Sequence, residues 1–193
     1  MLRIFLIRPG ATDYDQQRRI QGTLDVPLNE QGNAEVARLI EQLQGRGIET
    51  IYTSASEPAL QTAQAIAKAL GIRLKKLDRM QNLDFGLWQG MRIEEVRLRQ
   101  PKVYRQWQEQ PDTVCPPQGE MLGQAEARIS ATLTPLLKRH REGAIGIVLP
   151  EPLATVVRRW LNQSELGDLW KTGDEHGRWE VLEVERSAVV QII

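Results

Sequence analysis

Short apolar runs alternate with amphipathic segments along the first part of the chain. The apolar run at 2–7 ends in a Pro-Gly turn, which indicates a buried strand. Apolar residues then recur at helical spacing after Asn29, and this pattern predicts a helix that is capped by Asn29 and ends at Gly45 or Gly47. A further apolar run predicts a second strand at 48–54.

The same alternation continues to residue 77. Segment 56–71 predicts a helix that is capped by Ser54 or Ser56 and ends at Gly71, and 72–77 alternates like a strand with one solvated side. The repeated order of strand and helix favours an α/β fold of three layers, with helices on both faces of a mostly parallel sheet of about five to six strands.

The segment at 80–120 departs from this alternation. It predicts two short helices near 93–100 and 103–109 and a Pro-rich loop, and we expect it to carry a lid or substrate contacts. Beyond it the pattern predicts a long helix at 119–143, a central strand at 144–149, a helix at 151–163, and two strands in 177–193 around a turn near 185–187. Because no linker composition interrupts the chain, we expect a single domain over 1–193.

The composition limits the classes of partner. Of the 193 residues, 25 are Lys or Arg and 25 are Asp or Glu, so no basic excess favours nucleic acid or an anionic membrane. No apolar stretch approaches the roughly 20 residues that span a bilayer. The single cysteine, Cys115, argues against a disulfide framework and favours a reducing, cytoplasmic location. Only two histidines, His140 and His176, occur, so we expect no metal site and no cofactor.

Three stretches carry recognisable motifs. Residues 18–35 contain Gln-Gly-x-x-Asp-x-Pro-Leu-x-x-x-Gly, residues 51–67 contain Thr-Ser and then Ala-x-Gln-Thr-Ala, and residues 83–90 read Leu-Asp-Phe-Gly-Leu-Trp-Gln-Gly. With Arg8 after the first predicted strand, these stretches resemble in order and spacing the phosphoglycerate mutase-like histidine phosphatases. The resemblance covers essentially the whole chain and implies the phosphoglycerate mutase-like fold.

The residues that the resemblance assigns to the chemistry differ in this chain. In that family a phosphate lies between two arginines and two histidines, and a carboxylate protonates the leaving oxygen. Of these groups only Arg8 matches. The degenerate positions are Pro9 for the nucleophilic histidine, Pro58 for the second arginine, Asn82 for the acid and Pro150 for the second histidine. The resemblance leaves a relict pocket whose candidate binding residues are Arg8, Thr12, Gln21 and Glu151.

These replacements predict a protein without catalytic residues. Proline offers no nucleophile, and asparagine cannot deliver a proton at neutral pH. Because general acid catalysis alone contributes about 10²–10⁴-fold, one arginine cannot replace the missing groups. We therefore expect a pseudoenzyme, a pseudophosphatase with a regulatory or protein-interaction role, whose partner is an unknown protein or a second copy of the chain.

Two alternatives stay open. The relict pocket could serve as a binding module for a phosphate ester or another small ligand, but Arg8 would contribute only about 1.5–3 kcal/mol toward the roughly 8 kcal/mol of micromolar binding. A residual phosphomonoesterase would need an unidentified nucleophile, and the patterns around His140 and His176 are those of exposed histidines. If Arg8 is buried, we expect it to pair with an internal acceptor such as Glu151, because their strand ends should be neighbours.

Aromatic residues are the candidates for an interaction surface. Trp107, Trp160, Trp170 and Trp179, with the loop 110–120, fit either an interface or the packing of helices inside the domain.

Overall fold

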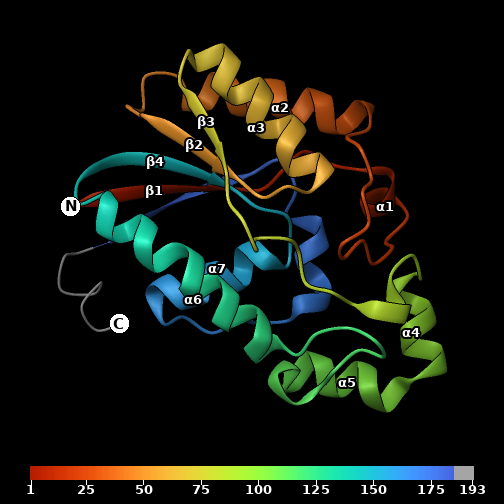
Figure 1. Cartoon of the computed structure of the whole chain (residues 1–193). Helices are drawn as coiled ribbons and strands as arrows, with labels where there is room; N and C mark the ends of the chain where they lie inside the picture. The colour runs from red at the N-terminus through yellow and green to blue at the C-terminus, as the bar shows by residue number, and fades with distance from the viewer. Residues whose placement is uncertain (185–193) are drawn as a thin grey trace.

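The computed structural model describes residues 1–184, and its centre is a five-stranded sheet with the strand order β3-β2-β4-β1-β5 (Figure 1). The strands are β1 (Leu2–Ile7), β2 (Thr50–Thr53), β3 (Arg73–Lys76), β4 (Gly143–Val148) and β5 (Trp179–Val184). The first four are parallel, and β5 runs antiparallel beside β1. The predicted α/β class is confirmed, and β4 is the central strand, as its apolar sequence indicated.

Helices cover both faces of the sheet, so the fold has three layers (Figure 1). Helices α2 (Glu30–Leu43) and α3 (Glu57–Leu70) cover one face, and α6 (Leu122–Arg139) and α7 (Leu153–Asn162) cover the other. Strand β1 shows how the sequence forms both cores, because successive side chains of a strand point to opposite faces. Ile4 and Leu6 join the core under α6 and α7, whereas Phe5 and Ile7 join the core under α2 and α3.

Local sequence signals fix the ends of α2 and α3. The Asn29 side chain accepts from the Gly32 amide at 2.9 Å, which is the predicted N-cap. Gly71 ends α3 in the left-handed conformation that glycine adopts at low cost. Ser56 occupies the N-cap position of α3 but makes no capping bond, because its hydroxyl lies 2.9 Å from that of Ser54.

The segment at 80–120 lies beyond the carboxyl ends of the parallel strands (Figure 1). Its two predicted helices are α4 (Ile93–Arg99) and α5 (Pro101–Glu109), and two short 3-10 helices flank them, η1 (Gly86–Trp88) and η2 (Pro111–Thr113). The hydrophobic pattern missed two further elements, α1 (Asp13–Gln16) and the 3-10 helix η3 (Leu169–Asp174), both too short to show a period. That this segment acts as a lid stays a prediction.

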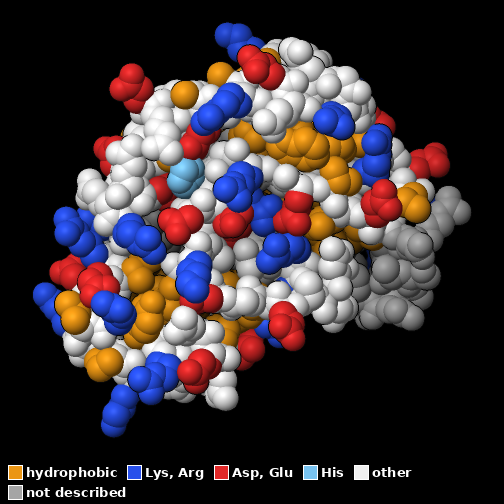
Figure 2. Space-filling view, turned by 180° about the vertical axis from the view of Figure 1, so that it is seen from behind, with side chains coloured by type: hydrophobic (Ala, Val, Ile, Leu, Met, Phe, Trp, Pro, Cys, Tyr) orange, Lys and Arg blue, Asp and Glu red, His pale blue; other side chains and the backbone are white. Residues whose placement is uncertain are grey.

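The last predicted strand and the turn near 185–187 lie outside the described residues. Within residues 1–184, no helix combines the length and the apolar character that crossing a bilayer requires. Figure 2 shows acidic and basic side chains interspersed over the back of the molecule, with hydrophobic side chains visible between them. This face therefore presents no continuous area of a single charge.

Candidate functional site

The turn after β1 is fixed by contacts to α2 and α3. The Gly10 amide donates to Thr62 Oγ1 at 3.2 Å, and the Ala11 amide donates to Glu35 Oε2 at 2.9 Å. A Cβ at Gly10 would lie 2.3 Å from the Gly32 carbonyl oxygen, and a Cβ at Gly32 would meet the Ala11 oxygen at 2.1 Å. The turn therefore needs glycine at both positions, and this close approach brings the Glu35 carboxylate under the turn.

Arg8 directly follows β1, and two carboxylates hold its guanidinium group. Arg8 Nε donates to Glu151 Oε1 at 2.8 Å, and Nη1 contacts Glu180 on β5. Desolvation by burial lowers the pKa of Arg8, but the two carboxylates outweigh it and hold that pKa above its ordinary value. The same burial raises the pKa of Glu151, although Arg8 opposes the shift. The expected pair of Arg8 with Glu151 is confirmed, and Glu180 is an additional partner.

Arg8 lines a pocket at the carboxyl end of the sheet, which we call the Arg8 pocket. Its volume is about 80 Å³, several times the roughly 10–15 Å³ that one water needs. Polar and charged groups reach it from the turn after β1, from α1 and from η3. They are Arg8, Thr12, Asp15, Arg19, Gln21, Glu151, Thr172 and His176. All four predicted binding residues, Arg8, Thr12, Gln21 and Glu151, thus lie around one pocket.

His176 is the histidine of this pocket, which corrects the expectation that it lies in an exposed loop. Its Nδ1 lies 2.9 Å from Glu35 Oε2, and 26% of its side chain is exposed. The Gly177 amide donates to the Pro9 carbonyl, so the backbone holds this residue against the turn after β1. No sequence pattern links position 176 to position 9, because the contact depends on how η3 and β5 return to the sheet.

Hydrogen bonds keep the Glu35 carboxyl charged. Burial raises its pKa, but donors from Gln31, the Ala11 amide and His176 outweigh that effect, and the pKa lies below its ordinary value. In the tautomer in which Nδ1 donates to Glu35, the free lone pair of the imidazole lies on Nε2. Among the described residues, Nε2 of His176 has no hydrogen-bond partner. In that tautomer, a side chain that lines the pocket therefore carries a nitrogen able to accept a hydrogen bond.

Asp15 is a second titratable group of the Arg8 pocket. Its Oδ2 accepts from the Thr12 amide at 2.7 Å, and its own amide donates to Thr12 Oγ1 at 3.3 Å, which forms the capping box of α1. The Thr12 hydroxyl also donates to Asp15 Oδ2 at 2.8 Å. Desolvation by burial raises the pKa of Asp15, and it outweighs the hydrogen bonds from Thr12 that lower it. Asp15 was not among the four predicted binding residues, because a carboxylate in a turn usually caps a helix or faces solvent.

The four degenerate positions separate into two groups. Pro9, Pro58 and Pro150 all line the Arg8 pocket, so three strand or helix ends meet where the resemblance places the reacting groups. Asn82 does not line it. Its Nδ2 donates to the Glu151 carbonyl at 2.8 Å, and its Oδ1 accepts from the Leu83 amide at 2.9 Å.

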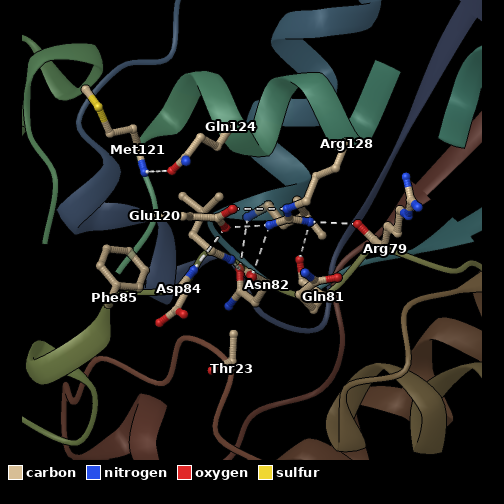
Figure 3. A network of polar contacts seen from close by, with 12 residues as sticks. Thr23, Arg79, Gln81, Asn82, Asp84, Phe85, Glu120, Met121, Gln124 and Arg128 are labelled. Carbon is tan, nitrogen blue, oxygen red and sulfur yellow. Dashed lines mark hydrogen bonds and ion pairs between the residues drawn. The ribbon is translucent and has the colours of Figure 1, made fainter. Parts of the chain in front are cut away.

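Figure 3 shows Asn82 within a network that fastens the segment after β3 to α6. Arg128 on α6 donates to the carbonyls of Arg79, Gln81 and Asn82 at 2.9, 2.7 and 3.2 Å. Its Nη2 also pairs with Glu120 at 2.6 Å. Asn82 therefore positions the backbone beside the pocket. Its bond to the backbone carbonyl of Glu151 also connects that residue to the network.

The structure corrects the expectation for His140 and decides between the two interpretations of Trp107 and Trp170. His140 is not a solvated cation, because its Nε2 lies 2.7 Å from the Tyr52 hydroxyl, and burial together with Lys75 and Arg139 lowers its pKa. Trp107 and Trp170 are 1% and 4% exposed, and they pack with Trp88 inside the chain. These two tryptophans are core residues, so they offer no interaction surface. An unknown protein partner or self-association stays a prediction.

The described side chains offer no ready metal site. Within residues 1–184, no three His, Cys, Asp or Glu side chains gather as they would around a metal ion.

Comparison with known proteins decides the family. A sequence-family model described as "Histidine phosphatase superfamily (branch 1)" matches residues 4–191. The chain belongs to the histidine phosphatase superfamily. This match confirms the resemblance that the three motifs indicated.

Several curated proteins are similar to this histidine phosphatase family member. Phosphoserine phosphatase 1 of Hydrogenobacter thermophilus is 29% identical over 185 residues, which cover 96% of this chain and 88% of that protein. A probable phosphoglycerate mutase GpmB of Salmonella arizonae is 29% identical over 138 residues, which cover 72% of this chain and 64% of that protein.

Solved structures share the fold. YhfR of Bacillus stearothermophilus superimposes with a TM-score of 0.83 at 25% identity, covering 96% of this chain and 93% of that one. The mycobacterial glucosyl-3-phosphoglycerate phosphatase Rv2419c superimposes with a TM-score of 0.81 at 23% identity, covering 94% of this chain and 92% of that one. The phosphoglycerate mutase-like architecture is therefore confirmed.

These relatives correct the functional expectation. The sequence analysis predicted an inactive protein with a regulatory or interaction role, but the similar proteins are named as phosphatases and mutases, and none of their names indicates a pseudoenzyme. The prediction of a pseudophosphatase is thus contradicted. The prolines at positions 9, 58 and 150 remain a fact of this sequence, so any chemistry in the pocket has to use other residues.

Proposed function

We propose that the chain is a phosphatase that hydrolyses small phosphate monoesters in the Arg8 pocket. One observation carries the proposal: His176, whose Nδ1 lies 2.9 Å from Glu35 Oε2, lines the same pocket as Arg8. The family and the names of the similar proteins support the reaction type. Because Pro9 cannot act as a nucleophile, the reaction needs a histidine from another part of the chain. Among the residues that line this pocket, His176 is the histidine.

The proposed reaction uses water as the nucleophile. Arg8 orients the phosphate group, and Glu35 holds His176 so that Nε2 takes a proton from water as the oxygen of that water bonds to phosphorus. The bond between phosphorus and the ester oxygen breaks, and the leaving oxygen takes a proton from Asp15 in its protonated form. His176 then releases its proton to solvent and Asp15 regains one, so both groups return to their starting state. One water is consumed, and the products are an alcohol and inorganic phosphate.

The arrangement predicts slow turnover. A positioned base and a positioned acid each contribute about 10²–10⁴-fold, whereas hydrolysis of phosphate monoesters is among the slowest uncatalysed reactions. Arg8 also shares its charge with Glu151 and Glu180, which weakens its attraction for a phosphate. We expect a value of kcat/KM below the usual range of about 10⁴–10⁸ M⁻¹s⁻¹.

We propose a cytoplasmic location, because the single Cys115 is free and exposed. Phosphoserine is a first substrate to test, since the relative from Hydrogenobacter thermophilus is named phosphoserine phosphatase. A generic aryl phosphate is a second one.

The experiment is hydrolysis of 4-nitrophenyl phosphate across pH 4–9, with activity measured in each fraction of a final size-exclusion column. The proposal predicts activity that follows the protein peak and falls at least tenfold in the Arg8→Ala variant. Activity that separates from the peak, or that is absent at every pH, would contradict it.

A further inference from the structure

The walls of the Arg8 pocket are largely apolar. Phe85 and Ile93 reach it from the segment at 80–120, and Leu169 and Trp170 reach it from η3. Trp170 is fixed, because its Nε1 donates to the Tyr104 carbonyl at 3.0 Å and its ring stacks on Tyr104 at 5.0 Å. The three prolines at 9, 58 and 150 extend the apolar wall to the floor of the pocket. A ligand in this pocket therefore meets a preformed apolar surface beside its polar groups.

The charges around the pocket offer little to a second anionic group. Two guanidinium groups, Arg8 and Arg19, line it, and two carboxylates, Glu151 and Glu180, contact Arg8, so these four formal charges cancel. Arg19 donates from Nη1 to the Gly90 carbonyl at 2.6 Å and from Nε to a glutamine side chain at 2.7 Å. Of the nitrogens of Arg8, Nη2 alone has no partner among residues 1–184. One phosphate can use this free donor, and a carboxylate on the same ligand would find Arg19 Nε and Nη1 already bonded to neutral acceptors.

We propose that the Arg8 pocket selects phosphate monoesters of uncharged, mainly apolar or aromatic alcohols and discriminates against esters that carry a carboxylate in addition to the phosphate. This inference rests on the proposed function for the reaction, but it concerns binding and can be tested without turnover. The apolar wall favours the alcohol group by the burial of carbon, at about fourfold in affinity for each buried CH₂.

The test measures the binding of two stable phosphonates by isothermal titration calorimetry. Phenylphosphonate presents an apolar ring, and 2-carboxyethylphosphonate presents a carboxylate on a short chain. The inference predicts that phenylphosphonate binds at least tenfold more tightly. Equal affinities, tighter binding of 2-carboxyethylphosphonate, or no binding of either compound at millimolar concentration would overturn it.

A matched pair of glycine variants isolates the role of charge. Gly173 lines the pocket, Gly123 on α6 does not, and a Cβ at either position meets no atom within 4 Å. A lysine at 173 adds a cation to the pocket wall, so Gly173→Lys should improve the binding of 2-carboxyethylphosphonate relative to phenylphosphonate by about five- to tenfold. Gly123→Lys should leave that ratio unchanged. The same change of ratio in both variants would contradict the inference.

The two proposals fail in different ways. Selective binding of phenylphosphonate without any hydrolysis of phenyl phosphate would retain the selectivity and overturn the proposed reaction. Hydrolysis that is faster for 3-phosphoglycerate or phosphoserine than for phenyl phosphate would retain the reaction and overturn the selectivity.

Discussion

Arg8 and Glu151 form an ion pair beneath the pocket, with Arg8 Nε 2.8 Å from Glu151 Oε1 and only 6% and 7% of their side chains exposed. Glu151 also accepts from the Thr155 amide at 3.2 Å, so the carboxylate joins the end of β1 to the first turn of α7. The Glu151 carboxylate thus occupies the Nε side of the Arg8 guanidinium group. By the family resemblance, this guanidinium group faces the phosphate. The pair fixes the floor of the pocket and limits the charge that a ligand can use.

The Glu151→Gln substitution should destabilise the fold. Breaking a buried ion pair costs about 3–5 kcal/mol, and because Glu180 still contacts Arg8, we expect a loss of about 2–4 kcal/mol in the free energy of unfolding. Urea denaturation at pH 7 measures it. Glu94→Gln is the control, since its pair with Arg97 is about half exposed and should change stability by less than about 1 kcal/mol. A Glu151→Gln variant as stable as the control would show that the pair does not hold the fold.

The Arg128→Met substitution should loosen the segment that follows β3. It removes the donors to three backbone carbonyls and leaves Glu120 without its cation, while the methionine retains the bulk of the stem (Figure 3). We expect a loss of about 2–4 kcal/mol in stability, together with faster hydrogen exchange at 83–85. Arg99→Met is the control, because Arg99 is 69% exposed. Unchanged exchange in the Arg128 variant would contradict the account of this network.

The strands and long helices could be predicted from the sequence because their signals are local. The apolar run of β1, the Asn29 cap and Gly71 each act through the nearest residues, and the structure places all three as expected. The positions of Pro9, Pro58 and Pro150 around one pocket could also be predicted, since parallel strands end at the same edge of a sheet.

The rest of the site depends on contacts that no local pattern encodes. His176 meets Glu35 across 141 positions of sequence, and Glu180 meets Arg8 only because β5 pairs antiparallel with β1. Glycine at 177 was the available signal beside His176, because a Cβ there would meet Glu35 at 2.8 Å. That signal can be interpreted only when the fold is known.

The Asp15→Asn substitution should change the dependence of hydrolysis on pH and on the leaving group. Burial raises the pKa of Asp15, and a carboxyl group donates a proton only below its pKa, so hydrolysis of an alkyl phosphate by the wild type should fall as pH rises through that raised value. Asparagine can still accept from the Thr12 amide but donates no proton, and the variant should lose this pH dependence.

Two substrates separate a proton donor from a structural residue. For phenethyl phosphate, whose alkoxide leaving group needs a proton, we expect at least a hundredfold loss of kcat in Asp15→Asn. For 4-nitrophenyl phosphate, whose leaving group is stable as an anion, we expect a loss of less than tenfold. Equal losses for both substrates would mean that Asp15 only shapes the pocket.

The most direct measurement compares kcat/KM for 4-nitrophenyl phosphate in the wild type, His176→Gln and His140→Gln, purified side by side. Glutamine can still hydrogen-bond to Glu35 but cannot take a proton from water, so His176→Gln should lose at least a hundredfold in activity. His140 lies away from the pocket beside Tyr52, and its variant should stay within about twofold of the wild type. If His176→Gln retains the activity of His140→Gln, the His176–Glu35 pair does not activate the water and the account is wrong.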